Sequence, residues 1–140
     1  MNPYKELTLP IIKIIHLMED LLIEPTSKTP LIDFSTSGKL VIAGSSFPEN
    51  TKEFFDPVIN WVGDLQSDYI DLDLVLEYMN TASAKKILEL LRKLEANLRI
   101  QNLTVNWYYD KDDDDSLEAG QILADTLSRI KFTYRVFEKK

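Results

Sequence analysis

The sequence contains no cysteine, and its 140 residues include a single histidine, His16, and four glycines. Without cysteine there can be no disulfide, thiolate nucleophile or cysteine metal site, and one histidine excludes a multi-histidine metal site. The glycine-rich motifs of nucleotide-binding proteins and the nucleophile elbow of hydrolases are also absent. His16 lies among apolar residues with no acid or nucleophile predicted to converge on it, so we interpret it as a packing residue.

Positive charge is scarce as well, because 16 Lys and Arg stand against 23 Asp and Glu, for a net charge of −7. Nucleic-acid backbones are bound by clustered cations, so this balance argues against a nucleic-acid partner. No apolar run approaches the roughly 20 residues of a membrane span. Charged residues such as Lys13 and Glu19 interrupt the apolar N-terminal stretch, which therefore does not match a signal peptide. We expect a cytoplasmic protein without a membrane partner.

The apolar residues alternate between strand and helix periodicities along the chain. Strands are predicted at 31–34, 39–43, 69–79, 103–109 and 132–136, and helices at 51–66, 82–98 and 116–128. This order predicts an α/β fold with a mixed, mostly parallel sheet of four to five strands. Polar residues alternate with apolar ones in the strand 69–79, so we expect the helices to cover mainly one face of the sheet.

Three local features carry more specific expectations. Apolar residues at helical spacing after Pro10 predict an amphipathic helix over 10–23. Pro57 predicts a kink in the helix 51–66, or a restart with Asp56 as the cap. Asp115, with Glu118 three residues later, is expected to cap the helix 116–128.

One strand carries three carboxylates on the same face, at Asp71, Asp73 and Glu77. Paired carboxylates perform general acid–base catalysis when a pocket shifts their pKa values. No nucleophile or second catalytic partner accompanies them, so a solvent-facing sheet surface is the favoured interpretation. A small enzyme that uses this face is an alternative function.

An acidic run spans residues 110–115 and resembles the start of a calcium-binding EF-hand loop. The loop needs Gly at its sixth position and Glu at its twelfth, where this chain has Asp115 and Gln121. A solvated acidic loop is therefore favoured. A divalent-ion-binding domain that uses this loop is the second form of the alternative function.

The strand 69–79 runs directly into a long helix through Asn80 and Thr81. Both residue types are good helix caps, which is the simpler interpretation on spacing alone. A hydroxyl at this junction also lies beside the free amides and the positive end of the helix dipole, where a phosphate is tolerated. Phosphorylation at the junction is the second interpretation.

Several segments, in this order and spacing, resemble the SiaC-like family of bacterial biofilm-regulating phosphoproteins, which have a STAS-like, anti-sigma-factor-antagonist-type fold. The matching segments are Ser46–Asn50, the helix through Phe54, Phe55 and Trp61, Tyr78–Ser83, Asn106–Tyr109 and the acidic loop after it. The resemblance implies a single domain over residues 18–140, with residues 1–17 as an N-terminal extension. It also implies an extended segment at 21–24, against the predicted helix.

The resemblance implies a non-enzymatic switch without a cofactor or a metal. In this family a dedicated kinase phosphorylates the threonine of an Asn-Thr-x-Ser motif, which is Thr81 here, with Ser83 as the less favoured site. A metal-dependent Ser/Thr phosphatase removes the phosphate, and the unphosphorylated form binds and activates a diguanylate cyclase. The implied switch-loop and partner-binding residues are Phe47, Pro48, Glu49, Asn50, Tyr78, Asn80, Thr81 and Ser83. The oligomeric state stays open, a homodimer included.

Overall fold

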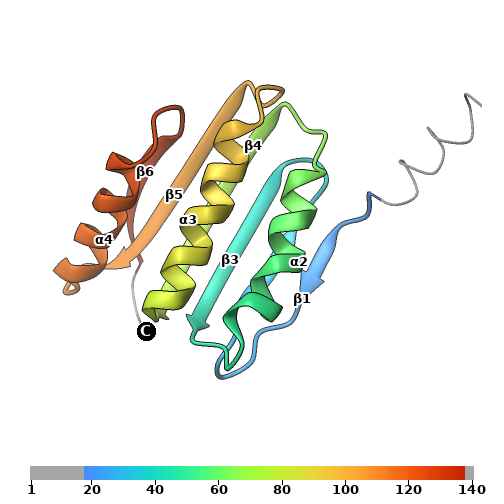
Figure 1. Cartoon of the computed structure of the whole chain (residues 1–140). Coiled ribbons are helices and arrows are strands. Elements are labelled where there is room, and N and C mark those ends of the chain that lie inside the picture. Colours follow the sequence, from blue (N-terminus) through green and yellow to red (C-terminus); the bar gives the residue numbers. More distant parts are fainter. Residues whose placement is uncertain (1–17, 138–140) are drawn as a thin grey trace, which may run out of the picture.

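The computed structural model describes residues 18–137, and the expectations for residues 1–17, including His16, lie outside this range (Figure 1). Six strands and three helices follow one another along the described chain. They are β1 (Leu21–Ile23), β2 (Leu31–Phe34), β3 (Lys39–Ser46), α2 (Thr51–Gly63), β4 (Tyr69–Met79), α3 (Thr81–Ala96), β5 (Asn102–Asp110), α4 (Asp114–Asp125) and β6 (Lys131–Phe137).

The six strands form one sheet in the order β1-β2-β3-β4-β5-β6. The pairs β1–β2 and β2–β3 are antiparallel, and every later pair is parallel. Each parallel crossover steps to the next strand in the same direction, and right-handed crossovers then place all three helices on one face. Figure 1 shows α2, α3 and α4 side by side in front of the sheet. The predicted α/β class and mostly parallel sheet are confirmed, with one strand more than expected.

The additional strand is β1, and it corrects the helix predicted over 10–23. Within the described part of that range, Leu21–Ile23 is extended and pairs with β2. Trp61 Nε1 donates a hydrogen bond to the Glu19 carbonyl at 2.8 Å, which holds this segment against α2. The apolar residues of this segment fit both the two-residue period of a strand and the spacing of a helix. Over three residues the two periods cannot be distinguished. Pairing with β2 decides in favour of the strand.

The hydrophobic core lies between the sheet and the helices. The strands contribute Ile32, Phe34, Leu40, Ile42, Ile70, Leu72, Leu74, Val105 and Trp107, and the helices contribute Phe55, Val58, Ile87, Leu90 and Leu91. Gly120 allows α4 to approach the sheet closely, since a Cβ at this position would lie 2.7 Å from Trp107 Cδ1. The opposite face of the sheet is not covered by any of the three helices.

Helix α2 begins at Thr51 as predicted, but the predicted restart at Asp56 and the predicted cap of α4 are wrong. Helix α2 runs without a restart through Pro57, and Asp56 forms ion pairs with Lys52 and Lys86 instead of capping. Pro57 is exposed, so water can satisfy the carbonyl that lacks its amide partner. Helix α4 begins at Asp114, and its cap is Asp113, not Asp115.

The shift of the α4 cap has a local cause. Asp113 accepts a hydrogen bond from Ser116 N at 3.0 Å, with the same three-residue spacing that had been assigned to Asp115 and Glu118. In a run of aspartates several residues fit the capping pattern, and the pattern alone cannot choose among them.

Candidate functional site

The junction between β4 and α3 is built around Asn80. Its side chain accepts a hydrogen bond from Ser83 N at 2.8 Å and caps α3, while its own amide donates to the Ser46 carbonyl at 3.0 Å. Thr81 is the first residue of α3 and is exposed. Within the described part of the chain, its hydroxyl has no hydrogen-bond partner. The cap is therefore supplied by Asn80, and the hydroxyl of Thr81 faces solvent.

The second hydroxyl of the motif, Ser83, is in a different environment. Its side chain is fully buried, and Ser83 Oγ accepts a hydrogen bond at 2.8 Å from the equally buried Ser46 Oγ. This bond joins the end of β3 to the first turn of α3. An enzyme that modifies a hydroxyl must reach it, so the geometry favours Thr81 over Ser83.

A β-bulge shapes the surface just before the junction. Gly44 of β3 pairs with Leu76 and Ser45 pairs with Tyr78, so Glu77 is the extra residue on β4. Gly44 has φ +110°, a conformation that glycine adopts without strain. Such bulges redirect side chains. In β4 every second side chain is buried as far as Leu76, and this alternation ends there.

Past the bulge, Tyr78 is 56% exposed, and its ring meets the ring of Phe47 edge to face at 5.7 Å. Phe47 belongs to the loop after β3, where Pro48 is buried and exposed Glu49 forms an ion pair with Lys28 at 2.8 Å. The last residue of this loop, Asn50, caps α2 by accepting from Glu53 N at 3.0 Å.

All eight predicted switch-loop residues therefore gather at one end of the molecule. Parallel strands β3 and β4 end at the same edge of the sheet, which places the loop 47–50 beside the start of α3. In Figure 1 the starts of α2 and α3 both lie at the lower edge, near the arrowhead of β3. The structure brings together a solvent-facing hydroxyl and an exposed aromatic pair.

A cleft of about 210 Å³ opens next to this surface, and we call it the switch-side cleft. It is lined by Leu76, Glu77, Tyr78, Met79, Trp107, Asp113, Asp115, Ser116 and Ala119. Apolar side chains of β4 and β5 and exposed carboxylates from the α4 start share the lining. Sequence reasoning missed this cleft because it combines three elements that are distant in sequence.

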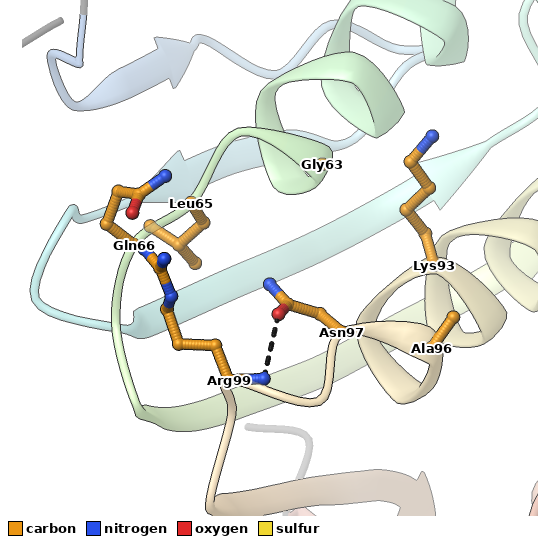
Figure 2. A pocket seen from close by; sticks show the side chains of 7 residues that line it. All are labelled: Gly63, Leu65, Gln66, Lys93, Ala96, Asn97 and Arg99. Atoms are coloured by element: carbon orange, nitrogen blue, oxygen red, sulfur yellow. Dashed lines mark hydrogen bonds between the residues drawn. The ribbon is translucent and has the colours of Figure 1, made fainter.

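A larger cavity of about 490 Å³ lies at the other end of α3 (Figure 2). It is lined by Gly63, Leu65, Gln66, Lys93, Ala96, Asn97 and Arg99. Figure 2 shows the side chains of Lys93 and Arg99 on either side of Asn97, whose Oδ1 accepts from Arg99 N at 3.1 Å. Helix α3 has 16 residues, so about 24 Å separate this cavity from Thr81.

Two of the carboxylates proposed for the alternative enzyme, Asp71 and Asp73, share one lysine and one asparagine as partners. Lys39 Nζ lies 3.0 Å from both Asp71 and Asp73, and Asn106 Nδ2 donates to the same two carboxylates at 2.6 and 2.7 Å. Burial raises the pKa of Asp71, but the hydrogen bonds from Lys39 and Asn106 outweigh it and lower the pKa below its usual value. A general base that works near neutral pH needs the opposite shift. Glu77 is the exposed residue of the bulge and does not join this cluster.

The acidic run is divided between a turn and a helix start. Asp110 ends β5 and accepts from Asp112 N at 2.9 Å, while Asp113 caps α4. Among the described residues, no group of three or more His, Asp or Glu side chains is arranged to hold a metal ion. In this structure the acidic loop therefore forms the turn before α4 and supplies the cap of that helix.

Fold and site together define a small α/β domain of the protein-binding type, with an exposed hydroxyl at a helix start beside an exposed aromatic pair. No helix of the described residues has the length and apolar character needed to cross a membrane. The family model for SiaC family regulatory phosphoproteins matches residues 23–137. The chain belongs to this family, as the sequence resemblance had indicated.

Individual relatives agree with this assignment. An uncharacterised protein of Pseudomonas aeruginosa strain UCBPP-PA14 is 38% identical over 99 residues, which cover 67% of this chain and 79% of the relative. SiaC of Pseudomonas aeruginosa superposes with a TM-score of 0.75 at 32% identity, covering 84% of this chain and 98% of SiaC. The SiaC structure solved in complex with the diguanylate cyclase SiaD, which it activates, gives 0.77 at 32% identity, covering 84% of this chain and 100% of that one.

Proposed function

We propose that this chain is a non-enzymatic, cytoplasmic regulator that binds and activates a diguanylate cyclase, and that phosphorylation of Thr81 switches this binding off. The observation that carries the proposal is the division of labour at the start of α3. Asn80 caps the helix, so the exposed hydroxyl of Thr81 is not needed for folding. A dedicated kinase would add the phosphate, and a metal-dependent Ser/Thr phosphatase would remove it.

The start of α3 suits a phosphate group. The first turn of a helix presents free amides and the positive end of the helix dipole, both of which stabilise an anion. The first turn of α3 contains no acidic residue, and Lys85 lies four residues after Thr81, on the same side of the helix. Phosphorylation is therefore expected to leave α3 folded and to change the surface alone.

The same surface explains how a phosphate would release a partner. Exposed carboxylates of Glu77, Asp113 and Asp115 already lie at the neighbouring switch-side cleft. A phosphate adds about 1.5 to 2 negative charges at neutral pH, and that charge must be desolvated under any docked protein. The aromatic pair of Phe47 and Tyr78 supplies apolar contact area for the unphosphorylated complex. Phosphorylation of Thr81 is therefore expected to lower the affinity of this surface for the partner.

The test compares three forms of the protein in titrations against the partner cyclase, with cyclic di-GMP synthesis as the second readout. Thr81→Ala should bind as tightly as wild type and stay active in the presence of the kinase. Thr81→Asp and the phosphorylated wild type should bind at least tenfold more weakly, about 1.4 kcal/mol or more. Equal binding of Thr81→Asp and wild type, together with phosphate found on another residue, would refute the assignment.

Thr51→Asp provides a matched control, because Thr51 is also the first residue of a helix capped by asparagine. Both substitutions place a carboxylate at the same helical position. A loss of binding confined to Thr81→Asp separates the switch from a general effect of charge at a helix start.

A further inference from the structure

The two edges of the sheet are protected very differently. Strand β1 has three residues and is followed closely by Pro25, whereas β6 has seven residues and contains neither proline nor glycine. An edge strand carries unpaired peptide groups that can pair with another chain, and proteins normally blunt such edges by short strands, prolines or charges. The β1 edge is protected by its short length and by the proline that follows it. The β6 edge is longer and has no proline.

The charged residues of β6 are two exposed cations, Lys131 and Arg135. Arg135 Nε donates to Thr133 Oγ1 at 3.5 Å, over the sheet face that the helices leave uncovered. Burial raises the pKa of Asp71, hydrogen bonds from Lys39 and Asn106 lower it, and the charge of Arg135 lowers it further. Arg135 is therefore held against Thr133 of its own strand, over the uncovered face of the sheet. Lys131, at the start of the strand, is the other cation of β6.

The helix-side face of this edge carries exposed apolar side chains. Tyr134 is 36% exposed, Val136 is 48% exposed, and Ile122 of α4 is 57% exposed. Burial raises the pKa of Tyr134, and the charge of Asp125 raises it further. Ile122 is one helical turn before Asp125 and lies on the same side. Helix α4 contacts β6, so three of the seven large exposed hydrophobic residues among those described lie on these two neighbouring elements.

We propose that β6 pairs antiparallel with β6 of a second copy of this chain, with the two-fold axis at Tyr134, the centre of the strand. The pairing joins the two sheets into one and uses the peptide groups of β6 that pair with no described strand. The interface is isologous, as a two-fold axis requires, and lies two strands away from β4. It uses neither Thr81 nor the aromatic pair.

The strand sequence is self-complementary in this register. On the helix side, Phe132 lies opposite Val136 and Tyr134 lies opposite its own copy, so apolar residues meet apolar residues. On the other face, Thr133 lies opposite Arg135 and Lys131 lies opposite Phe137, so no two like charges are directly opposed. This match to itself favours a second copy over the strand of a different protein.

The absence of cysteine makes a register-specific test available. In the proposed pairing, two copies of Tyr134→Cys face each other with Cβ atoms about 4.5–5.5 Å apart, close enough to form a disulfide after a small adjustment. Two copies of Val136→Cys are offset by four residues, about 14 Å along the strand, and cannot form one. Leu98→Cys, at a residue 79% exposed elsewhere, reports random collision.

We expect mild oxidation of the full-length chain to yield covalent dimer from Tyr134→Cys at least tenfold faster than from the other two variants. Sedimentation of the cysteine-free chain should show a dimer that Val136→Lys weakens at least tenfold and Leu98→Lys leaves unchanged. A monomer at every concentration, a dimer insensitive to Val136→Lys, or equal cross-linking of all three cysteine variants would overturn the proposal. Pairing of β6 seen only in the complex with the cyclase would also overturn it, in favour of a partner strand.

Discussion

Helices α2 and α3 begin with the same two residues, Asn50-Thr51 and Asn80-Thr81, yet their first turns differ. In both, the asparagine side chain accepts a hydrogen bond from the amide three residues later, at 3.0 Å from Glu53 and 2.8 Å from Ser83. The residue at this third position is an exposed carboxylate in α2 and a buried hydroxyl in α3.

From this difference we infer different roles for the two helix starts. Helix α2 already has a negative charge in its first turn to complement its dipole, whereas α3 has none and carries Lys85 on its second turn. A phosphate on Thr81 would supply the missing charge, but a phosphate on Thr51 would add to the negative charge that Glu53 already gives the first turn of α2. The proposed phosphorylation of Thr81 therefore rests on the charges and burial of the first turn of α3, and not on the Asn-Thr dipeptide alone.

The largest expected difference between the two helix starts is in phosphate incorporation by the kinase. Thr81→Ala should abolish labelling completely, because the remaining hydroxyl of the motif, on Ser83, is buried. Thr51→Ala should leave labelling at the wild-type level. Intact-mass and peptide mass spectrometry of the kinase-treated proteins distinguish the outcomes, and undiminished phosphate in Thr81→Ala would contradict the assignment.

A second prediction concerns the buried hydrogen bond that only α3 has. Ser46→Ala removes the donor to Ser83 Oγ, and leaving that buried group unsatisfied should lower the free energy of unfolding by about 1–3 kcal/mol. The double variant Ser46→Ala/Ser83→Ala should lose less than the sum of the single changes, since neither partner is then left alone. Urea unfolding measures both. Ser45→Ala, at the neighbouring partly exposed serine, is the control and should change stability by no more than about 0.5 kcal/mol.

Much of the fold is encoded in local patterns. The long alternation in β4 predicted this strand to its observed bounds, Tyr69–Met79, because one of its faces is buried and the other is not. The N-terminal strand β1 could not be recognised, since three residues carry too little periodicity and its formation depends on pairing with β2. The cap of α4 was misplaced by two residues within a run of aspartates that all fit the capping pattern.

The sequence indicated where the candidate site lies, at the junction of a strand and a helix, but not the contacts that build it. Asn80 and Thr81 stood out because a strand ran directly into a helix, and both looked like caps. Asn80 caps α3 through a local hydrogen bond from Ser83 N. The burial of Ser83, in contrast, involves a hydrogen bond with Ser46, 37 positions away, which no local pattern shows. The bulge at Glu77 and the switch-side cleft likewise depend on register and on packing between elements.

A third prediction sharpens the comparison at the caps themselves. Asn50→Ala and Asn80→Ala should each destabilise the protein by about 1 kcal/mol, because each removes the side chain that satisfies a helix amide. Thr81→Ala should cost no more than about 0.5 kcal/mol, as for an exposed residue away from any cap. Thermal or urea unfolding of the three variants measures the differences. A loss for Thr81→Ala as large as that for Asn80→Ala would return the capping role to the threonine.

The smallest expected effect concerns the ion pair that joins the two helices, between Asp56 of α2 and Lys86 of α3 at 2.8 Å. Hydrogen bonds from Lys52 and then Lys86 lower the pKa of Asp56, and the hydrogen bond to Asp56 is the largest influence that raises the pKa of Lys86. A carboxyl with a lowered pKa contributes stability above its unfolded pKa, near 3.9, and loses it as pH falls through the folded value. A lysine with a raised pKa contributes below about 10.4 and loses its contribution as pH rises through the folded value.

The pair should therefore stabilise the protein between these two limits. Asp56→Asn is expected to lower the melting temperature slightly at pH 7, and the difference from wild type should vanish in acid, once Asp56 is protonated in both the folded and unfolded states. Both side chains are partly exposed, so added salt should shrink the difference at pH 7. A difference that persists unchanged at acidic pH and in high salt would show that Asp56 acts through packing and not through its charge. In that case the starts of α2 and α3 would be coupled by shape alone.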